Sequence, residues 1–126
     1  MKKDWDRATY EHVRDELIRA AQYHGLTTYL DIAVIMGLDV NDPRKMQSDV
    51  GPILRQISAD EHAAGRPMLT AVAIGAKGRP SDPFFEQAKD FGQYRPSQTK
   101  KWFWERELRI VYKHWKRTYR QDSARC

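Results

Sequence analysis

Two cations at a glycine-rich turn are the first residues whose type and spacing suggest binding chemistry. Lys77 and Arg79 lie in the stretch GAKGRP, and Arg66 precedes the apolar segment that leads into it. Contacts with phosphate groups require only positive charge and reach, which a short turn between two glycines supplies. We expect Lys77, Arg79 and Arg66 to contact a nucleic-acid backbone. The alternative is a tight turn whose cations only keep it soluble.

A second set of candidates belongs to a predicted helix in the middle of the chain. Arg55 and Gln56 lie on this helix and Lys45 precedes it. Arg and Gln side chains form bidentate hydrogen bonds with guanine and adenine in the major groove of DNA. Asp49, at the front of the same helix, would repel phosphates. We expect Lys45, Arg55 and Gln56 to contact nucleic acid.

The C-terminal segment is strongly basic. Residues 100–126 hold nine basic and three acidic side chains, a balance of +6, so residues 1–99 carry −1 of the chain's net charge of +5. Such a segment suits phosphates or an acidic protein surface, and a solvated helix face is the alternative. We expect Lys100 and Lys101 to contact nucleic acid. The aromatic residues between these cations could stack on bases, but they more often form a core or a partner interface.

The sequence contains no motif that would bring catalytic or metal-binding residues together. Cys126, the single cysteine, is the last residue, where nothing would hold a base beside its thiol. Asp60, Glu61 and His62 are adjacent, whereas a helical metal pair needs a spacing of three or four residues. The glycine spacing matches no phosphate-binding loop. We predict no catalytic residue, no metal site and no cofactor, and a solvated helix end at residues 60–62.

Helical periodicity predicts the elements that position these residues. A first amphipathic helix spans about residues 5–24, with Asp4 or Asp6 as its N-cap and Gly25 as its left-handed stop. Thr28 and Asp31 approximate a capping box for a short helix that ends at Gly37. The third helix must begin near Ser48 or Asp49, because Pro52 is tolerated only in a first turn, and it runs to about Gly65.

The second half of the chain begins with the segment PMLTAVAI, residues 67–74, which is apolar on both faces and predicts one buried strand. The turn GAKGRPSDP follows, and Pro83 starts a short helix that Gly92 ends. The last helix spans about residues 98–120 with Ser97 or Thr99 as its cap. Its predicted buried seam consists of Trp104, Leu108, Val111, Trp115 and Tyr119.

This order predicts a mainly α fold with a small β element. We expect one domain over residues 1–126: a winged-helix-like helix-turn-helix, flanked by N- and C-terminal helices, with the basic helix at the C-terminal end.

The stretch TYLDIAVIMGLDVNDPRKMQSDVGPIL, residues 28–54, resembles the winged-helix DNA-binding half of the alkylguanine-DNA alkyltransferases and alkyltransferase-like proteins. That family has a Thr-Tyr pair, then two residues, then Ile-Ala, and an Arg-x-Val-Gly motif in the next helix. The positions that match are Thr28, Tyr29, Ile32, Ala33, Gly37, Val50 and Gly51. The resemblance covers 27 of the 126 residues and implies the fold more than the function.

The departures from this family argue against its chemistry. Ser48 stands where the family has the arginine that fills the space of a flipped base. The segment GRPMLTAVAI replaces the Pro-Cys-His-Arg motif that supplies the reactive thiolate and its histidine. We therefore expect neither alkyl transfer nor base flipping.

Composition sets the remaining limits. Charged residues make up 31% of the chain and no run approaches the roughly 18 apolar residues of a membrane span, so we expect a soluble cytoplasmic protein without a membrane partner. The sequence favours a non-enzymatic protein that binds duplex DNA or another nucleic acid. The alternative is a protein-interaction module, such as an inhibitor or accessory subunit, that binds an acidic partner through its helices. A homodimer is compatible with both.

Overall fold

The computed structural model describes residues 5–116. Its first helix, α1 (Arg7–Gln22), confirms the predicted amphipathic helix and its cap: the Asp6 side chain accepts a hydrogen bond from the Thr9 amide at 2.8 Å.

The predicted stop of this helix at Gly25 is wrong, because His24 takes the left-handed conformation, with a φ of 56°. The His24 ring stacks on Tyr112, with ring centroids 5.0 Å apart, and this contact supports the unusual backbone.

The short second helix is confirmed in detail. Strand β1 (Thr27–Thr28) leads directly into α2 (Tyr29–Ile35). Thr28 and Asp31 form both hydrogen bonds of the capping box. Gly37, with a φ of +72°, lies just after the end of the helix, as expected of a left-handed C-terminal residue.

The third helix begins earlier than predicted. Helix α3 (Pro43–Ala63) starts one turn or more before Ser48, because the Asp42 side chain accepts hydrogen bonds from the Arg44 and Lys45 amides and Pro43 fits the first helical position. Pro52 therefore lies inside the helix. It is exposed to solvent, and Gly51 before it carries no Cβ to clash with the proline ring, which reduces the cost of an internal proline.

The predicted strand over residues 67–74 is wrong for most of its length. The chain forms a 3-10 helix, η1 (Leu69–Val72), and only then strand β2 (Ala73–Ile74). Strand β2 pairs in parallel with β1, in the register Thr27 to Ala73 and Thr28 to Ile74. All four η1 residues are buried, and η1 packs against α1, α3 and α5. An apolar run suits this buried path as well as it suits a strand.

Two more helices complete the described chain. Helix α4 (Asp82–Asp90) has Pro83 in its first turn, and α5 (Lys100–Trp115) is capped by the Thr99 side chain, as predicted. The buried row of α5 is Phe103, Glu107 and Val111. The predicted seam is therefore correct at Val111 but shifted elsewhere: Trp104, Leu108 and Trp115 are half-buried beside this row, and Tyr119 and residues 117–120 of the predicted helix lie outside the described residues.

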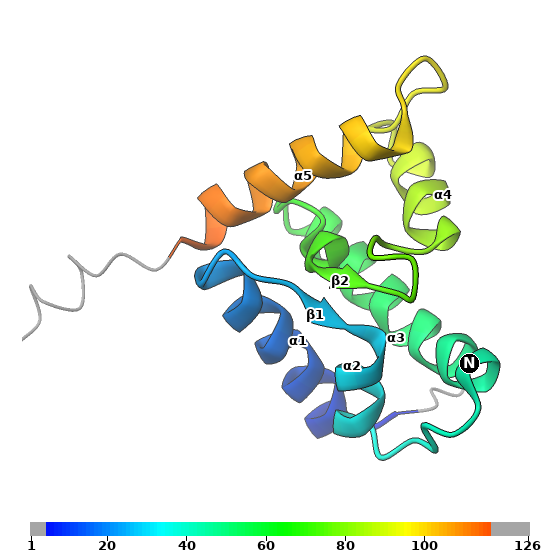
Figure 1. Ribbon diagram of the computed structural model, residues 1–126. Helices are drawn as coiled ribbons and strands as arrows, with labels where there is room; N and C mark the ends of the chain where they lie inside the picture. Colours follow the sequence, from blue (N-terminus) through cyan, green and yellow to red (C-terminus); the bar gives the residue numbers. More distant parts are fainter. Residues whose placement is uncertain (1–4, 117–126) are drawn as a thin grey trace, which may run out of the picture.

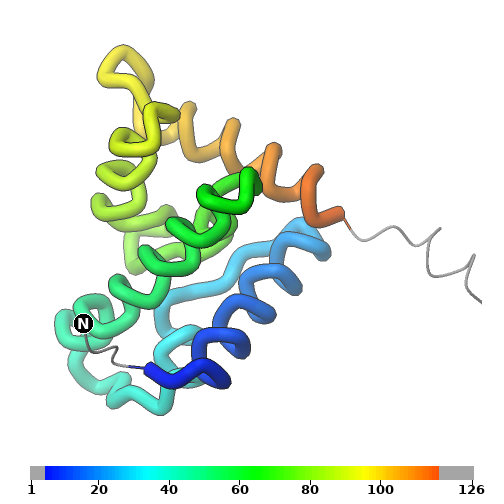
Figure 2. Tube along the Cα trace, turned by 180° about the vertical axis from the view of Figure 1, so that it is seen from behind, coloured from blue at the N-terminus to red at the C-terminus, as the bar shows by residue number. Residues whose placement is uncertain are grey.

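Helices pack around η1, and strands β1 and β2 lie side by side near the middle of the molecule (Figure 1). Helices α1, α3 and α5 surround η1, while α2 packs on α1 and α3, and α4 packs on α3. Seen from behind, α3 runs diagonally across the molecule from α2 toward α5 (Figure 2). The expected mainly α fold with a small β element is confirmed at this level. Among the described helices, none is both long and apolar enough to cross a membrane.

Candidate nucleic-acid interface

The exposed side of α3 carries a polar stripe. Arg44, Gln47, Ser48, Gly51 and Arg55 follow helical spacing and line one shallow hollow. Arg44, Gln47, Ser48 and Arg55 are exposed, and the opposite side of the helix is buried in the core. The stripe thus has a cation at each end, with Gln47 and the small residues Ser48 and Gly51 between them.

The turn after β2 lies beside this stripe. Its backbone closes through hydrogen bonds from the Gly75 amide to the Arg79 carbonyl and from the Gly78 amide to the Gly75 carbonyl, both at 3.0 Å. Gly78 has a φ of +77°, which a residue with a side chain adopts only with strain. The closed turn presents Lys77, which is exposed, and Arg79, which is half-buried. The hydrogen-bonded backbone of the turn therefore holds both cations close together at the surface.

Tyr29 joins this turn to the start of α2. Its hydroxyl lies 2.9 Å from the Ser81 hydroxyl and accepts a hydrogen bond from the Ser81 amide at 3.0 Å. The ring is 5% exposed, and a Cβ at Gly75 would lie 3.5 Å from it. Tyr29 thus fixes the turn relative to the helices, and it is not a surface residue that could contact a base.

The stripe and the turn form one continuous surface. Gln47 lines the hollow on α3 and also the hollow against the turn. We call this region the cationic surface and define it by Arg44, Gln47, Ser48, Gly51, Pro52, Arg55, Lys77 and Arg79. Within residues 5–116, none of its four cations forms an ion pair. Asp82 also lines the hollow against the turn, but its ion pair is with Lys100, whose hydrogen bond and charge lower the pKa of Asp82, and the charges of Lys77 and Arg79 add to this effect. The four cations thus keep a net positive charge that faces an anionic ligand.

Two other predicted site residues, Lys45 and Lys100, form ion pairs within the protein. Lys45 forms an ion pair with Asp49 at 3.0 Å, which neutralises the carboxylate that would repel phosphates and raises the pKa of Lys45. Lys100 binds Asp82 at 2.9 Å, and this contact lowers the pKa of Asp82. Both pairs are exposed and flank the cationic surface.

Three further predicted residues lie apart from it. The Gln56 amide donates to Asp60 at 3.0 Å on the side of α3 that faces α1. Lys101 is exposed on the first turn of α5. Arg66 forms an ion pair with Glu61 at 2.8 Å near the end of α3. Arg66 is thus not part of the same surface as Lys77 and Arg79.

Sequence reasoning found Arg55, Lys77 and Arg79 but missed the other members of the cationic surface: the polar residues Arg44 and Gln47 and the small residues Ser48, Gly51 and Pro52 beside them. The sequence signal that could have found Arg44 and Gln47 was the Asp42-Pro43 pair, which caps a helix that begins before these two residues. It also missed that Glu61 is fully buried, so that the prediction of a solvated helix end at residues 60–62 is wrong at this position. In the described part of the chain, no group of three or more His, Cys, Asp or Glu residues is arranged to hold a metal ion.

The Tyr29 hydroxyl gives a direct test of how the turn is held. Tyr29→Phe should lower the free energy of unfolding by about 1 to 2 kcal/mol, because the Ser81 amide and hydroxyl lose a part-buried partner. Chemical denaturation measures this loss. Tyr23→Phe, at an exposed tyrosine of the same type, is the matched control and should leave stability unchanged. Equal stability of the two variants would contradict the role assigned to Tyr29.

The fold and this surface define a mainly helical protein with a small parallel sheet and a group of surface cations that form no ion pair within residues 5–116. Comparisons of the chain with protein-family models, with curated proteins and with solved structures find no match.

Proposed function

We propose that this chain is a non-enzymatic cytoplasmic protein that binds duplex DNA through the cationic surface. The observation that carries the proposal is the position of four cations, Arg44, Arg55, Lys77 and Arg79, on one continuous surface without ion-pair partners in the described residues. Phosphate contacts supply most of the affinity of proteins for DNA, and they need exposed positive charge of this kind.

The order of elements supports a winged-helix-like mode of binding. Helix α3 follows α2 after a turn, and the chain then returns so that β2 lies beside β1. The resemblance of residues 28–54 to a winged-helix segment agrees with this arrangement. The described sheet consists of one parallel pair of strands. In this mode of binding, the turn at residues 75–80 alone therefore contacts the DNA backbone in the way that a wing does.

The dimensions of α3 suit the major groove. Arg44 and Arg55 are eleven residues apart, which places them about 17 Å apart along the helix axis. The major groove is about 12 Å wide, so the two arginines can reach phosphates on opposite sides of it. Between them, Ser48, Gly51 and Pro52 have little side-chain bulk, and a groove edge can approach the helix closely. Gln47 is exposed between the two arginines, and we propose that it contacts base edges.

The dependence of affinity on salt tests the proposal. The logarithm of affinity for a mixed-sequence duplex should fall linearly with the logarithm of salt concentration, by about 0.9 per phosphate contacted, because cations that bind phosphates release counterions. We expect a slope that corresponds to about three to six contacts. Fluorescence anisotropy at several salt concentrations measures it. No binding at low salt would eliminate the proposal.

Exposed apolar side chains on α2 favour the second candidate, a protein-interaction module. Leu30 and Val34 lie one turn apart on this helix and are 46% and 63% exposed. Apolar side chains grouped on a surface are typical of protein contacts. A partner held by this group would bind with a much flatter salt dependence than DNA does, so the same titration separates the two candidates.

A further inference from the structure

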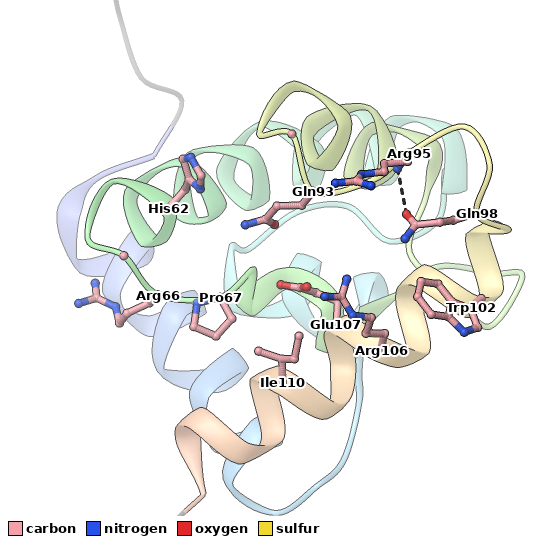
Figure 3. A pocket seen from close by; sticks show the side chains of 12 residues that line it. His62, Arg66, Pro67, Gln93, Arg95, Gln98, Trp102, Arg106, Glu107 and Ile110 are labelled. Carbon is pink, nitrogen blue, oxygen red and sulfur yellow. Dashed lines mark hydrogen bonds between the residues drawn. The ribbon is translucent and has the colours of Figure 1, made fainter.

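A second hollow, of about 780 Å³, lies between the end of α3, the loop over residues 92–98 and one side of α5 (Figure 3). A volume of this size accommodates a small ligand such as a nucleotide. The hollow shares no lining residue with the cationic surface. Its ligand would therefore bind independently of duplex DNA.

Two buried polar groups meet in this hollow. Glu107 is 4% exposed, and one carboxylate oxygen accepts a hydrogen bond from the Met68 amide at 3.1 Å. Figure 3 shows the carboxylate pointing from α5 into the hollow, toward the Gln93 side chain on the opposite wall. The Gln93 carbonyl oxygen is buried and has no hydrogen-bond partner among the described residues. The Gln93 oxygen is closed to solvent, so the Glu107 carboxylate is the group placed to accept hydrogen bonds from a ligand.

The buried carboxyl group of Glu107 is an unusual choice for this position. A glutamine would keep an acceptor for the Met68 amide without a buried charge. Burial also raises the pKa of the Glu107 carboxyl group, against the hydrogen bond from Met68 and the charge of Arg106. A buried carboxyl group at a concave site is typical of a group kept for binding.

The rim of the hollow combines an aromatic ring with cations. Trp102 is 50% exposed, and the Arg106 guanidinium lies 5.8 Å from the centre of its ring. Arg95 belongs to the facing loop, where its amide donates to the Gln98 side chain at 2.9 Å. Arg66 also lines the hollow, but it is bound to Glu61 and Figure 3 shows its guanidinium turned away from Glu107. Arg95 and Arg106 are thus the cations available to a phosphate.

We propose that this hollow binds a guanine nucleotide, with Glu107 on the base and Arg95 and Arg106 on the phosphate. Guanine presents two adjacent donors, N1–H and N2–H, along one edge, and a carboxylate accepts both at once. Adenine and cytosine present a single amino group on that edge. Trp102 offers a face on which the base stacks. A free nucleotide and an unpaired guanine of a nucleic-acid strand share this chemistry.

Isothermal titration calorimetry with the full chain tests the base contact. GMP should bind at least about tenfold more tightly than AMP. Glu107→Gln should lose this preference and bind GMP at least about tenfold more weakly, while its melting temperature stays equal or rises. Glu105→Gln, at an exposed glutamate of the same helix, is the matched control and should bind GMP normally.

Further variants test the phosphate contact and the stacking. Arg106→Ala should weaken GMP binding about tenfold and leave guanosine binding nearly unchanged, whereas Arg109→Ala on the same helix should affect neither. Trp102→Ala, at a half-exposed position that the fold tolerates, should weaken both ligands. Absence of GMP binding at about 1 mM, or unchanged GMP affinity in folded Glu107→Gln or Trp102→Ala, overturns the proposal.

The source of the guanine follows from a second titration. A short single-stranded oligothymidylate that ends in guanine is compared with dGMP. Tighter binding of the oligonucleotide assigns the hollow to an unpaired strand, and equal binding assigns it to a free nucleotide. Loss of duplex binding in Lys77→Glu/Arg79→Glu with GMP binding retained would show that the two sites act separately, so failure of one proposal leaves the other intact.

Discussion

Replacing both cations of the turn with glutamate should reduce affinity for duplex DNA about 100-fold at low salt. In Lys77→Glu/Arg79→Glu, two phosphate contacts are lost and two repulsive charges appear, each worth about 1 kcal/mol at a solvated surface before screening. The slope of affinity against salt should fall by about two contacts. The melting temperature should change little, since Lys77 is exposed and Arg79 is partly exposed.

The matched control for this result carries the same change in net charge at another place. Lys89 and Lys113 are exposed and lie outside the cationic surface. Lys89→Glu/Lys113→Glu should weaken DNA binding only a few-fold, through long-range repulsion. If both double variants lost affinity equally, net charge rather than the turn would account for binding.

The second large effect concerns stability at the buried carboxylate of Glu61. This side chain is 1% exposed and binds Arg14 at 3.1 Å and Arg66 at 2.8 Å. Glu61→Ala should cost about 3 kcal/mol, at the lower end of the range for a broken buried pair, because both guanidinium groups reach solvent. Thermal unfolding should show a loss of about 10 °C.

Glu11→Ala is the control for this substitution. Glu11 forms an exposed ion pair with Arg7 on α1, and its loss should cost about 0.5 kcal/mol or less. A similar stability loss in both variants would show that the buried pair contributes no more than a surface one.

The contribution of Glu61 should also depend on pH. Burial raises its pKa, but hydrogen bonds and charge from Arg66 and Arg14 outweigh burial and hold the pKa below its ordinary value of 4.5. The folded state therefore releases this proton more readily than the unfolded state does, so the stabilisation is complete above about pH 4.5 and disappears as the pH falls through the lowered value. The stability difference between wild type and Glu61→Gln, measured by denaturation from pH 7 to pH 3, should shrink accordingly.

Local signals in the sequence predicted the helix starts that depend on neighbouring residues. Asp6, the Thr28 and Asp31 pair, and Thr99 all cap the helices expected of them, because each bond spans only three residues. The start of α3 was missed because Pro52 was taken to exclude a helix interior, although Gly51 and solvent exposure make it tolerable.

Features that depend on distant partners could not be predicted in the same way. The burial of Glu61 depends on Arg14, 47 residues earlier, and that of Glu107 on Met68, 39 residues earlier. The apolar run at residues 67–74 does not reveal whether its neighbours are strands or helices, and three helices surround it. The exposed cations Lys77, Arg79 and Arg55 were found by type, but their shared surface with Arg44 emerges only from the packing of α3 beside the turn.

The central position of η1 has a consequence for how this chain folds. Its backbone depends on α5, since the Glu107 carboxylate accepts from the Met68 amide and the Trp104 indole donates to the Ala71 carbonyl at 2.8 Å. Leu69 and Val72 are fully buried only when α1, α3 and α5 have all docked. The two hydrogen bonds span 39 and 33 residues, and η1 also packs on α1 and α3, so the loop-closure entropy of these contacts is paid late and together. During synthesis on the ribosome, the nascent chain therefore stays incompletely folded until α5 has emerged from the exit tunnel.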